Sequence, residues 1–73
     1  MTVEEATFKI LQEDKSFGMS VNELVNKVYD LVHREDPDKD RCSVHVEVID
    51  ALKRGREAKK IKETTTGFYC WNR

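Results

Sequence analysis

The sequence predicts an α+β domain in which three helices precede a C-terminal two-stranded β-hairpin. Two serines, Ser20 and Ser43, each stand before a run of apolar residues at helical spacing, as capping residues do. A polar loop that contains Pro37 separates the two runs, because proline cannot continue a helix. Residues 59–71 then read as a basic segment, a Thr-Thr-Thr-Gly turn and an aromatic segment, which is the order of a hairpin.

A first helix is expected near the N-terminus, from Val3 to about residues 12–14. Thr2 can cap it, and acidic residues in its first turn favour the positive end of the helix dipole. Residues 15–18 are predicted to form a turn, in which Gly18 supplies backbone freedom. Met19 is placed to add a third, very short strand beside the hairpin. The apolar stripe of this helix is Val3, Ala6, Ile10 and Leu11, and Phe8 lies off it.

The second and third helices carry most of the predicted core. Ser20 and Glu23 fit a capping box, and the second helix should run to about His33, before the polar stretch 34–41. Ser43 should cap the third helix. The hairpin is predicted as strands at 59–63 and 68–71 around a turn at 64–67. The inward side of the third helix is expected to hold Val44, Val48, Ile49, Leu52 and Gly55, and its outward side His45, Val46, Glu47, Asp50, Lys53 and Arg54. The expected core of the whole domain is Ile10, Leu11, Leu24, Val28, Val48, Leu52, Ile61 and Trp71.

Size and composition bound the possibilities. At 73 residues the chain is predicted to form a single domain, 1–73, with one modest core. It has no apolar run long enough to span a membrane, so we expect no membrane partner. The first ten residues lack a signal-peptide pattern, which favours a cytoplasmic location. Cys42 and Cys70 are then expected to be free thiols.

Charge is distributed unevenly along the chain. Residues 1–50 contain 6 Lys and Arg against 12 Asp and Glu, a net charge of −6, whereas residues 51–73 contain 7 against 2, a net charge of +5. This separation is typical of a protein with one face for an anionic partner. A basic cluster that only complements a helix dipole and solubilises the hairpin explains it equally well.

The order helix, capped helix, loop, capped helix and hairpin resembles the winged helix-turn-helix superfamily over nearly the whole chain. The ending IKETTTGFYCW, residues 61–71, is similar to the wings of many small regulators. The chain also resembles the helix-turn-helix module often found beside chromatin factors and restriction enzymes, which likewise ends in a glycine-aromatic strand. One departure is the polar stretch of about eight residues before the third helix, which is longer than a classical helix-turn-helix turn.

The resemblance implies a small regulatory protein that binds duplex DNA, with the exposed face of the third helix in the major groove. Residues 53–62 hold six basic residues against the single Glu57, and such a cluster at a helix end and wing root can contact phosphates. A solvated basic hairpin is the plainer interpretation. The expected DNA-binding residues are His45, Lys53, Arg54, Arg56, Lys59, Lys60, Lys62 and Thr65.

Acidic residues on the same helix favour an alternative function. Glu47 and Asp50 lie on the outward face, where two carboxylates close to phosphates are repelled. An exposed Val46 and an exposed Phe68 suggest an apolar patch for a protein partner or for a homodimer. The alternative is therefore a winged helix that serves as a protein-interaction or dimerisation module, with Val46, Glu47, Asp50 and Phe68 as its contact residues.

Metal sites and catalysis are weakly indicated. Asp36, Asp38 and Asp40 superficially resemble a calcium loop, and counted from Asp36 the twelfth position is Glu47, but the sixth position is Arg41 instead of the glycine that the loop's sharp turn needs. A solvated loop is the default interpretation, and no calcium is expected.

Cysteine and histidine give a second incomplete pattern. Cys42 and His45 are spaced C-x-x-H, and His33 and Cys70 can complete a zinc tetrahedron only as isolated ligands. The same Cys42 and His45 imitate a thiolate–imidazole pair, but nothing supplies an orienting third group or an oxyanion site. We therefore predict no enzyme, no metal, no cofactor and no small-molecule substrate.

Overall fold

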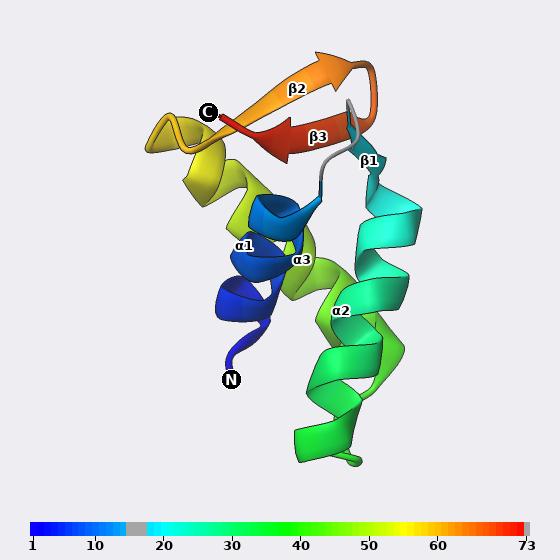
Figure 1. The fold of residues 1–73 in the computed structure, drawn as a ribbon. Helices are drawn as coiled ribbons and strands as arrows, with labels where there is room; N and C mark the ends of the chain where they lie inside the picture. The colour runs from blue at the N-terminus through cyan, green and yellow to red at the C-terminus, as the bar shows by residue number, and fades with distance from the viewer. Residues whose placement is uncertain (15–17, 73) are drawn as a thin grey trace.

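The computed structural model describes residues 1–14 and 18–72 and has the predicted α+β architecture. The helices are α1 (Val3–Glu13), α2 (Val21–Glu35) and α3 (Arg41–Glu57), and the strands are β1 (Met19–Ser20), β2 (Ile61–Thr65) and β3 (Phe68–Trp71). The three helices pack against one another, and the small sheet covers one end of the helical layer (Figure 1). This arrangement is compatible with a winged helix. No helix in the described part of the chain has the length and apolar character needed to cross a membrane.

The sheet is antiparallel, with the order β1-β3-β2. The expected strand at Met19 is confirmed, and Met19 pairs with Tyr69. The predicted first strand of the hairpin was misplaced by two residues, because β2 begins at Ile61 and extends to Thr65. A register shift between Glu63 and Thr65 marks an irregularity in the β2–β3 ladder. The turn is therefore shorter than predicted, and Gly67 takes a positive φ of 83° in it. The predicted turn at residues 15–18 lies, apart from Gly18, outside the described residues.

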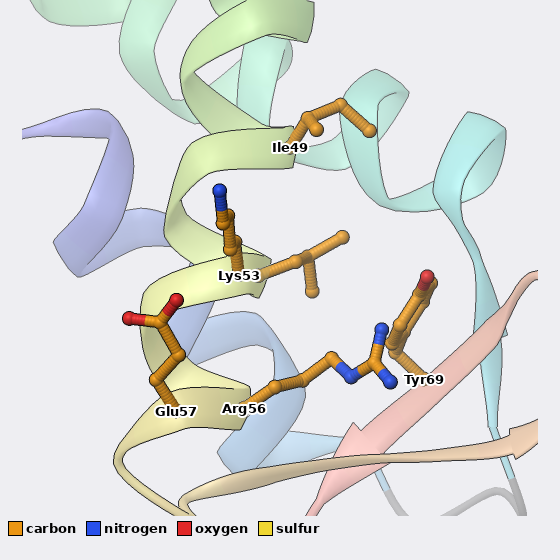
Figure 2. Close-up of a pocket in the computed structure, with 6 residues that line it drawn as sticks. Ile49, Lys53, Arg56, Glu57 and Tyr69 are labelled. Atoms are coloured by element: carbon orange, nitrogen blue, oxygen red, sulfur yellow. The ribbon is translucent and has the colours of Figure 1, made fainter.

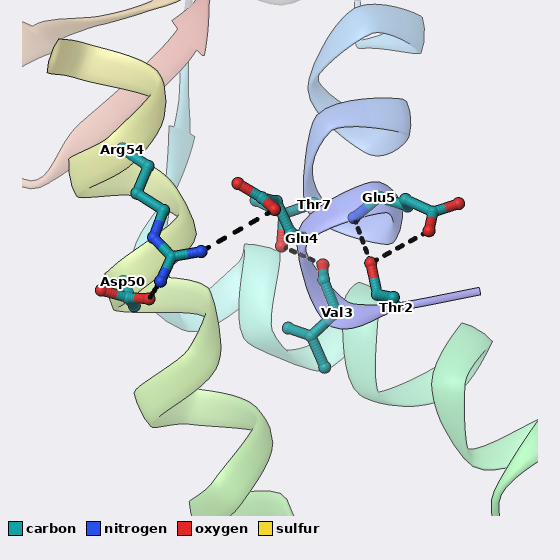
Figure 3. Close-up of polar contacts among 7 residues, drawn as sticks. All are labelled: Thr2, Val3, Glu4, Glu5, Thr7, Asp50 and Arg54. Carbon is teal, nitrogen blue, oxygen red and sulfur yellow. Dashed lines mark hydrogen bonds and ion pairs between the residues drawn. The ribbon is translucent and has the colours of Figure 1, made fainter. Parts of the chain in front are cut away.

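The helix caps are confirmed at two of three positions. The Thr2 hydroxyl accepts a hydrogen bond from the Glu5 amide at 3.1 Å, and the Ser20 hydroxyl accepts one from the Glu23 amide at 3.2 Å. Figure 3 shows the first of these at the start of α1.

The prediction that Ser43 caps α3 was wrong. Asp40 is the N-cap, and its carboxylate accepts a hydrogen bond from the Ser43 amide at 2.7 Å. That hydrogen bond lowers the pKa of Asp40, and the anionic carboxylate suits the positive end of the helix. Because α3 starts at Arg41 and α2 continues to Glu35, only residues 36–40 connect the two helices. The connection is shorter than the polar stretch of about eight residues seen in the sequence.

The core contains six of the eight residues expected there: Leu11, Leu24, Val28, Val48, Leu52 and Ile61. Ile10 and Trp71 are half-buried and pack against its edge. Phe8, off the main stripe of α1, meets the edge of the Trp71 ring with centroids 5.6 Å apart, which ties α1 to β3. Ile49 does not face inward as predicted, because its side chain is 44% exposed. It follows Val48 by one residue, which is a rotation of about 100° around the helix and away from the core.

The junction between α3 and β2 fixes the direction of the hairpin. The Lys60 amide donates to the Gly55 carbonyl at 2.8 Å and the Lys59 amide to the Arg56 carbonyl at 3.1 Å, while Lys59 takes a φ of 62°. These two bonds and the left-handed residue form a Schellman motif. The helix therefore continues two residues past Gly55. The absence of a side chain at Gly55 leaves room for the side chain of Ile61, whose Cγ1 would lie 2.9 Å from an added Cβ.

Candidate nucleic-acid interface

The exposed surface of α3 has two sides of different character. Arg54 reaches Glu4 of α1 at 4.0 Å and so marks the side that faces α1 (Figure 3). The opposite side faces β3, where Ile49 and Arg56 line a hollow with Tyr69 (Figure 2). All six predicted outward residues of α3 are exposed, as expected.

The carboxylates of α3 are paired within the chain. Asp50 contacts Arg54 at 3.1 Å, and Glu47 contacts Lys39 at 2.7 Å. The hydrogen bond to Glu47 raises the pKa of Lys39, so this lysine stays charged. Exposed pairs of this kind add little to stability. They offset part of the negative charge that argued against a phosphate partner.

Both of the predicted DNA-binding arginines, Arg54 and Arg56, also form ion pairs within the chain. Arg54 is shared between Asp50 and Glu4. Arg56 lies 3.8 Å from Glu63 and 5.9 Å from the centre of the Tyr69 ring, in cation–π geometry. Both side chains stay more than half exposed, but carboxylates of the chain already offset part of their charge, so they offer less unpaired charge to a ligand than the sequence suggested.

The lysines form the unpaired part of the basic cluster. Lys53, Lys59, Lys60 and Lys62 are exposed, and none of them belongs to an ion pair found among residues 1–14 and 18–72. They lie on the last turns of α3, in the Schellman turn and on the first half of β2, at the corner where α3 passes into the hairpin (Figure 1). We call these four residues the lysine corner.

The remaining predicted DNA-binding residues lie away from the lysine corner. Thr65 is at the far end of β2, about 10 Å along the strand from Lys62. His45 lies on the first half of α3, about 12 Å along the helix from Lys53. The structure therefore does not gather all eight predicted residues into one patch.

The alternative contact residues are also divided. Val46 is 67% exposed and Phe68 is 43% exposed, as predicted. Val46 and Glu47 line a shallow hollow with Lys39, whereas Phe68 lines a separate one with Thr64. The four alternative residues accordingly do not make one continuous apolar surface.

Sequence reasoning missed the hollow between α3 and β3. It has a volume of about 520 Å³ and is lined by Ile49, Leu52, Lys53, Arg56, Glu57 and Tyr69. Tyr69 is two residues from Trp71, so alternation along β3 turns both toward the helices, and this signal was available. Ile49 was misjudged because it adjoins the buried Val48.

The candidate metal ligands have other roles where the structure describes them. Asp40 caps α3, and His33 stacks on Tyr29 with ring centres 5.1 Å apart. Cys42 and Cys70 are free thiols, the first exposed and the second half-buried. Within residues 1–14 and 18–72, no group of three or more His, Cys, Asp and Glu side chains is placed to hold a metal ion.

Comparisons with known proteins give no further guide. No protein-family model, no curated protein and no solved structure matches the chain. Any functional assignment therefore depends on the geometry of α3 and the hairpin.

Proposed function

We propose that this chain is a winged helix-turn-helix domain that binds duplex DNA through the lysine corner, in a regulatory role. The observation that carries the proposal is the separation of paired from unpaired charge. Glu47 is paired with Lys39, and Asp50 shares Arg54 with Glu4, whereas the four lysines keep their charge for a ligand. Unpaired lysines that neutralise phosphates supply most of nonspecific DNA affinity.

The connection between α2 and α3 gives a second line of support. Five residues, 36–40, join the helices, which is longer than the three or four of a helix-turn-helix but closer to that length than the eight-residue polar stretch in the sequence. The Asp40 cap fixes the start of α3. A helix is about 10–12 Å wide and the major groove about 12 Å, so the exposed face of α3 has the dimensions to enter it.

A salt-dependent titration against a mixed-sequence duplex tests the proposal. If all four lysines contact phosphates, the slope of log K against log salt is about −3.6, which is about a 150-fold loss of affinity from 50 to 200 mM. Replacing Lys60 and Lys62 with glutamine should reduce the magnitude of that slope by about 1.8. Lys59 is left intact because its left-handed backbone is part of the helix end.

The matched control replaces Lys9 and Lys27, exposed residues of α1 and α2, with glutamine. This control makes the same change in net charge outside α3 and the hairpin, which carry the lysine corner, and it should leave the slope unchanged. Absence of binding at low salt would refute the proposal. Equal loss in the two double variants would show that only net charge matters.

The exposed Val46 favours a second candidate, the protein-interaction module. Replacing both Glu47 and Asp50 with lysine distinguishes the two functions by the sign of the effect. DNA binding should strengthen, because two negative charges near phosphates become positive. Capture of a protein partner or self-association should weaken, because charge pairs set register and specificity there. Thermal melting of the variant controls for the lost pairs with Lys39 and Arg54.

A further inference from the structure

An apolar strip runs along the exposed face of α3. Val46 and Ile49 are the large hydrophobic side chains of α3 that the structure leaves exposed, at 67% and 44%. With Cys42 before them and Lys53 after them, they are spaced four, three and four residues apart, so all four fall on one side of the helix. We call Cys42, Val46, Ile49 and Lys53 the α3 strip. It is about 16 Å long, which corresponds to about five base pairs.

The chemistry of the strip limits what it can recognise in DNA. Reading guanine or adenine in the major groove takes bidentate donors such as arginine, asparagine or glutamine, and the centre of the strip has none. The thymine methyl group is the apolar feature of base edges in that groove. Aliphatic side chains on a helix that lies in the groove match that methyl group and no other base edge.

The surroundings of the strip favour a nucleic acid over a protein. Lys53, at one end, belongs to the lysine corner. Arg41, at the other end, is exposed and donates to the Asn22 amide oxygen at 3.5 Å, and it is in no ion pair found within the described ranges. Two aliphatic side chains fall far short of the 800 Å² or so that each partner buries in a stable protein interface. Arg41 and Lys53 give the strip a cation near each end, which suits a groove bordered by phosphates, and the flanking Glu47 and Asp50 are paired with Lys39 and Arg54.

We propose that Val46 and Ile49 contact thymine methyl groups in the major groove, so that the domain prefers thymine-containing duplexes. This preference rests on the proposed DNA binding and adds a sequence class to it. The contact is a van der Waals and hydrophobic one, with no hydrogen bond to the base.

The test compares two duplexes of one sequence, the first with thymine and the second with deoxyuridine at every thymine position. The duplexes carry the same phosphates and the same base pairing and differ in the methyl groups. We expect about fourfold tighter binding to the thymine duplex for each methyl contacted, and about 16-fold for two, since burial of one such group is worth about 0.8 kcal/mol. Replacing both Val46 and Ile49 with alanine should lower the ratio of affinities toward one, because binding to the thymine duplex should weaken more than binding to the deoxyuridine duplex.

Two controls make the result specific. Alanine is the best helix former, so the double variant should keep the far-ultraviolet circular dichroism of the parent. Phe68→Ala removes an exposed hydrophobic side chain outside the strip and should leave the ratio unchanged.

Each other outcome overturns the inference in a distinguishable way. Equal affinity of the parent for the two duplexes overturns the thymine contact and leaves DNA binding through the lysine corner intact. A preference that persists in the double variant assigns the discrimination to duplex shape instead of the strip. If neither duplex binds, the proposed function fails and the inference fails with it. If light scattering shows a dimer that the double variant abolishes, while the ratio stays at one, the strip is a protein contact.

Discussion

Replacing Gly55 with alanine adds one methyl group where α3 meets β2. The added Cβ would lie 2.9 Å from the Cγ1 of Ile61, would clash with its Cδ1, and would lie 3.3 Å from its Cβ. Ile61 is buried, with 3% of its surface exposed, so its side chain has little room to move aside. The contact lies where the start of the hairpin packs against α3.

The expected magnitude follows from two opposing effects. Overpacking a filled core costs about 1–3 kcal/mol, and exchanging glycine for alanine inside a helix gains about 1 kcal/mol. We therefore expect Gly55→Ala to lower the free energy of unfolding by about 1 kcal/mol. Ile61→Val alone, which removes the clashing Cδ1, should cost about 0.5–1.5 kcal/mol. In the double variant the clash with Cδ1 is gone and the shorter valine side chain can adjust its remaining contact, so the two costs should not add, and the coupling should reach about 1 kcal/mol.

Urea unfolding gives the free energy of unfolding of the parent, the two single variants and the double variant. The single tryptophan, Trp71, is the fluorescence probe, and circular dichroism is the second probe. Comparable m values are required for the comparison. Gly67→Ala is the matched control. Its cost comes from a φ of 83° with nothing within 4 Å of the added Cβ, and Ile61→Val should not rescue it. A stabilised Gly55→Ala variant, or strict additivity with Ile61→Val, would refute the close contact.

Three further changes test local features of the fold. Asp40→Ala should lower the Tm by about 4–8 °C, whereas Ser43→Ala should leave it nearly unchanged, because Asp40 is the cap of α3. Because the pKa of Asp40 is lowered on folding, its contribution is present above its unfolded pKa and is lost as the pH falls through the folded one. A Tm series in acid should therefore show the gap between the parent and Asp40→Ala narrowing. In urea melts, Lys59→Gly should raise the free energy of unfolding by about 0.5–1 kcal/mol, because glycine adopts a left-handed backbone without strain. Ala58→Gly, at a residue with a negative φ, should not raise it. Leu24→Ala, at a fully buried site, should cost about 2–5 kcal/mol and leave little folded protein.

The elements that were predicted correctly from the sequence depend on interactions between residues close together in the chain. Thr2 and Ser20 cap their helices through hydrogen bonds to residues three positions later, and such short-range contacts can be predicted from the sequence. Gly67 marks the hairpin turn because a positive φ favours glycine. The apolar spacing in α2 identified Leu24 and Val28 as core without knowledge of what they would contact.

The tertiary structure decided where local signals competed. Asp40 and Ser43 are both good caps three residues apart, and each implies a different start for α3. Ile49 adjoins the buried face of α3, and the positions of β3 and the other helices determine that it stays exposed. Neither choice is encoded in a few neighbouring residues.

Charge pairing was the largest difference between sequence and structure at the candidate site. The sequence shows Glu47 and Asp50 as two acidic residues on an outward face. The path of the loop before α3 brings Lys39 to Glu47, and the packing of α1 beside α3 places Glu4 as a second carboxylate on Arg54. The pair of Asp50 with Arg54 spans one helical turn and could be predicted from the sequence. Composition and periodicity therefore determined that this chain has three helices, a hairpin and a basic end, while the three-dimensional contacts determined which of its charges remain free for a ligand.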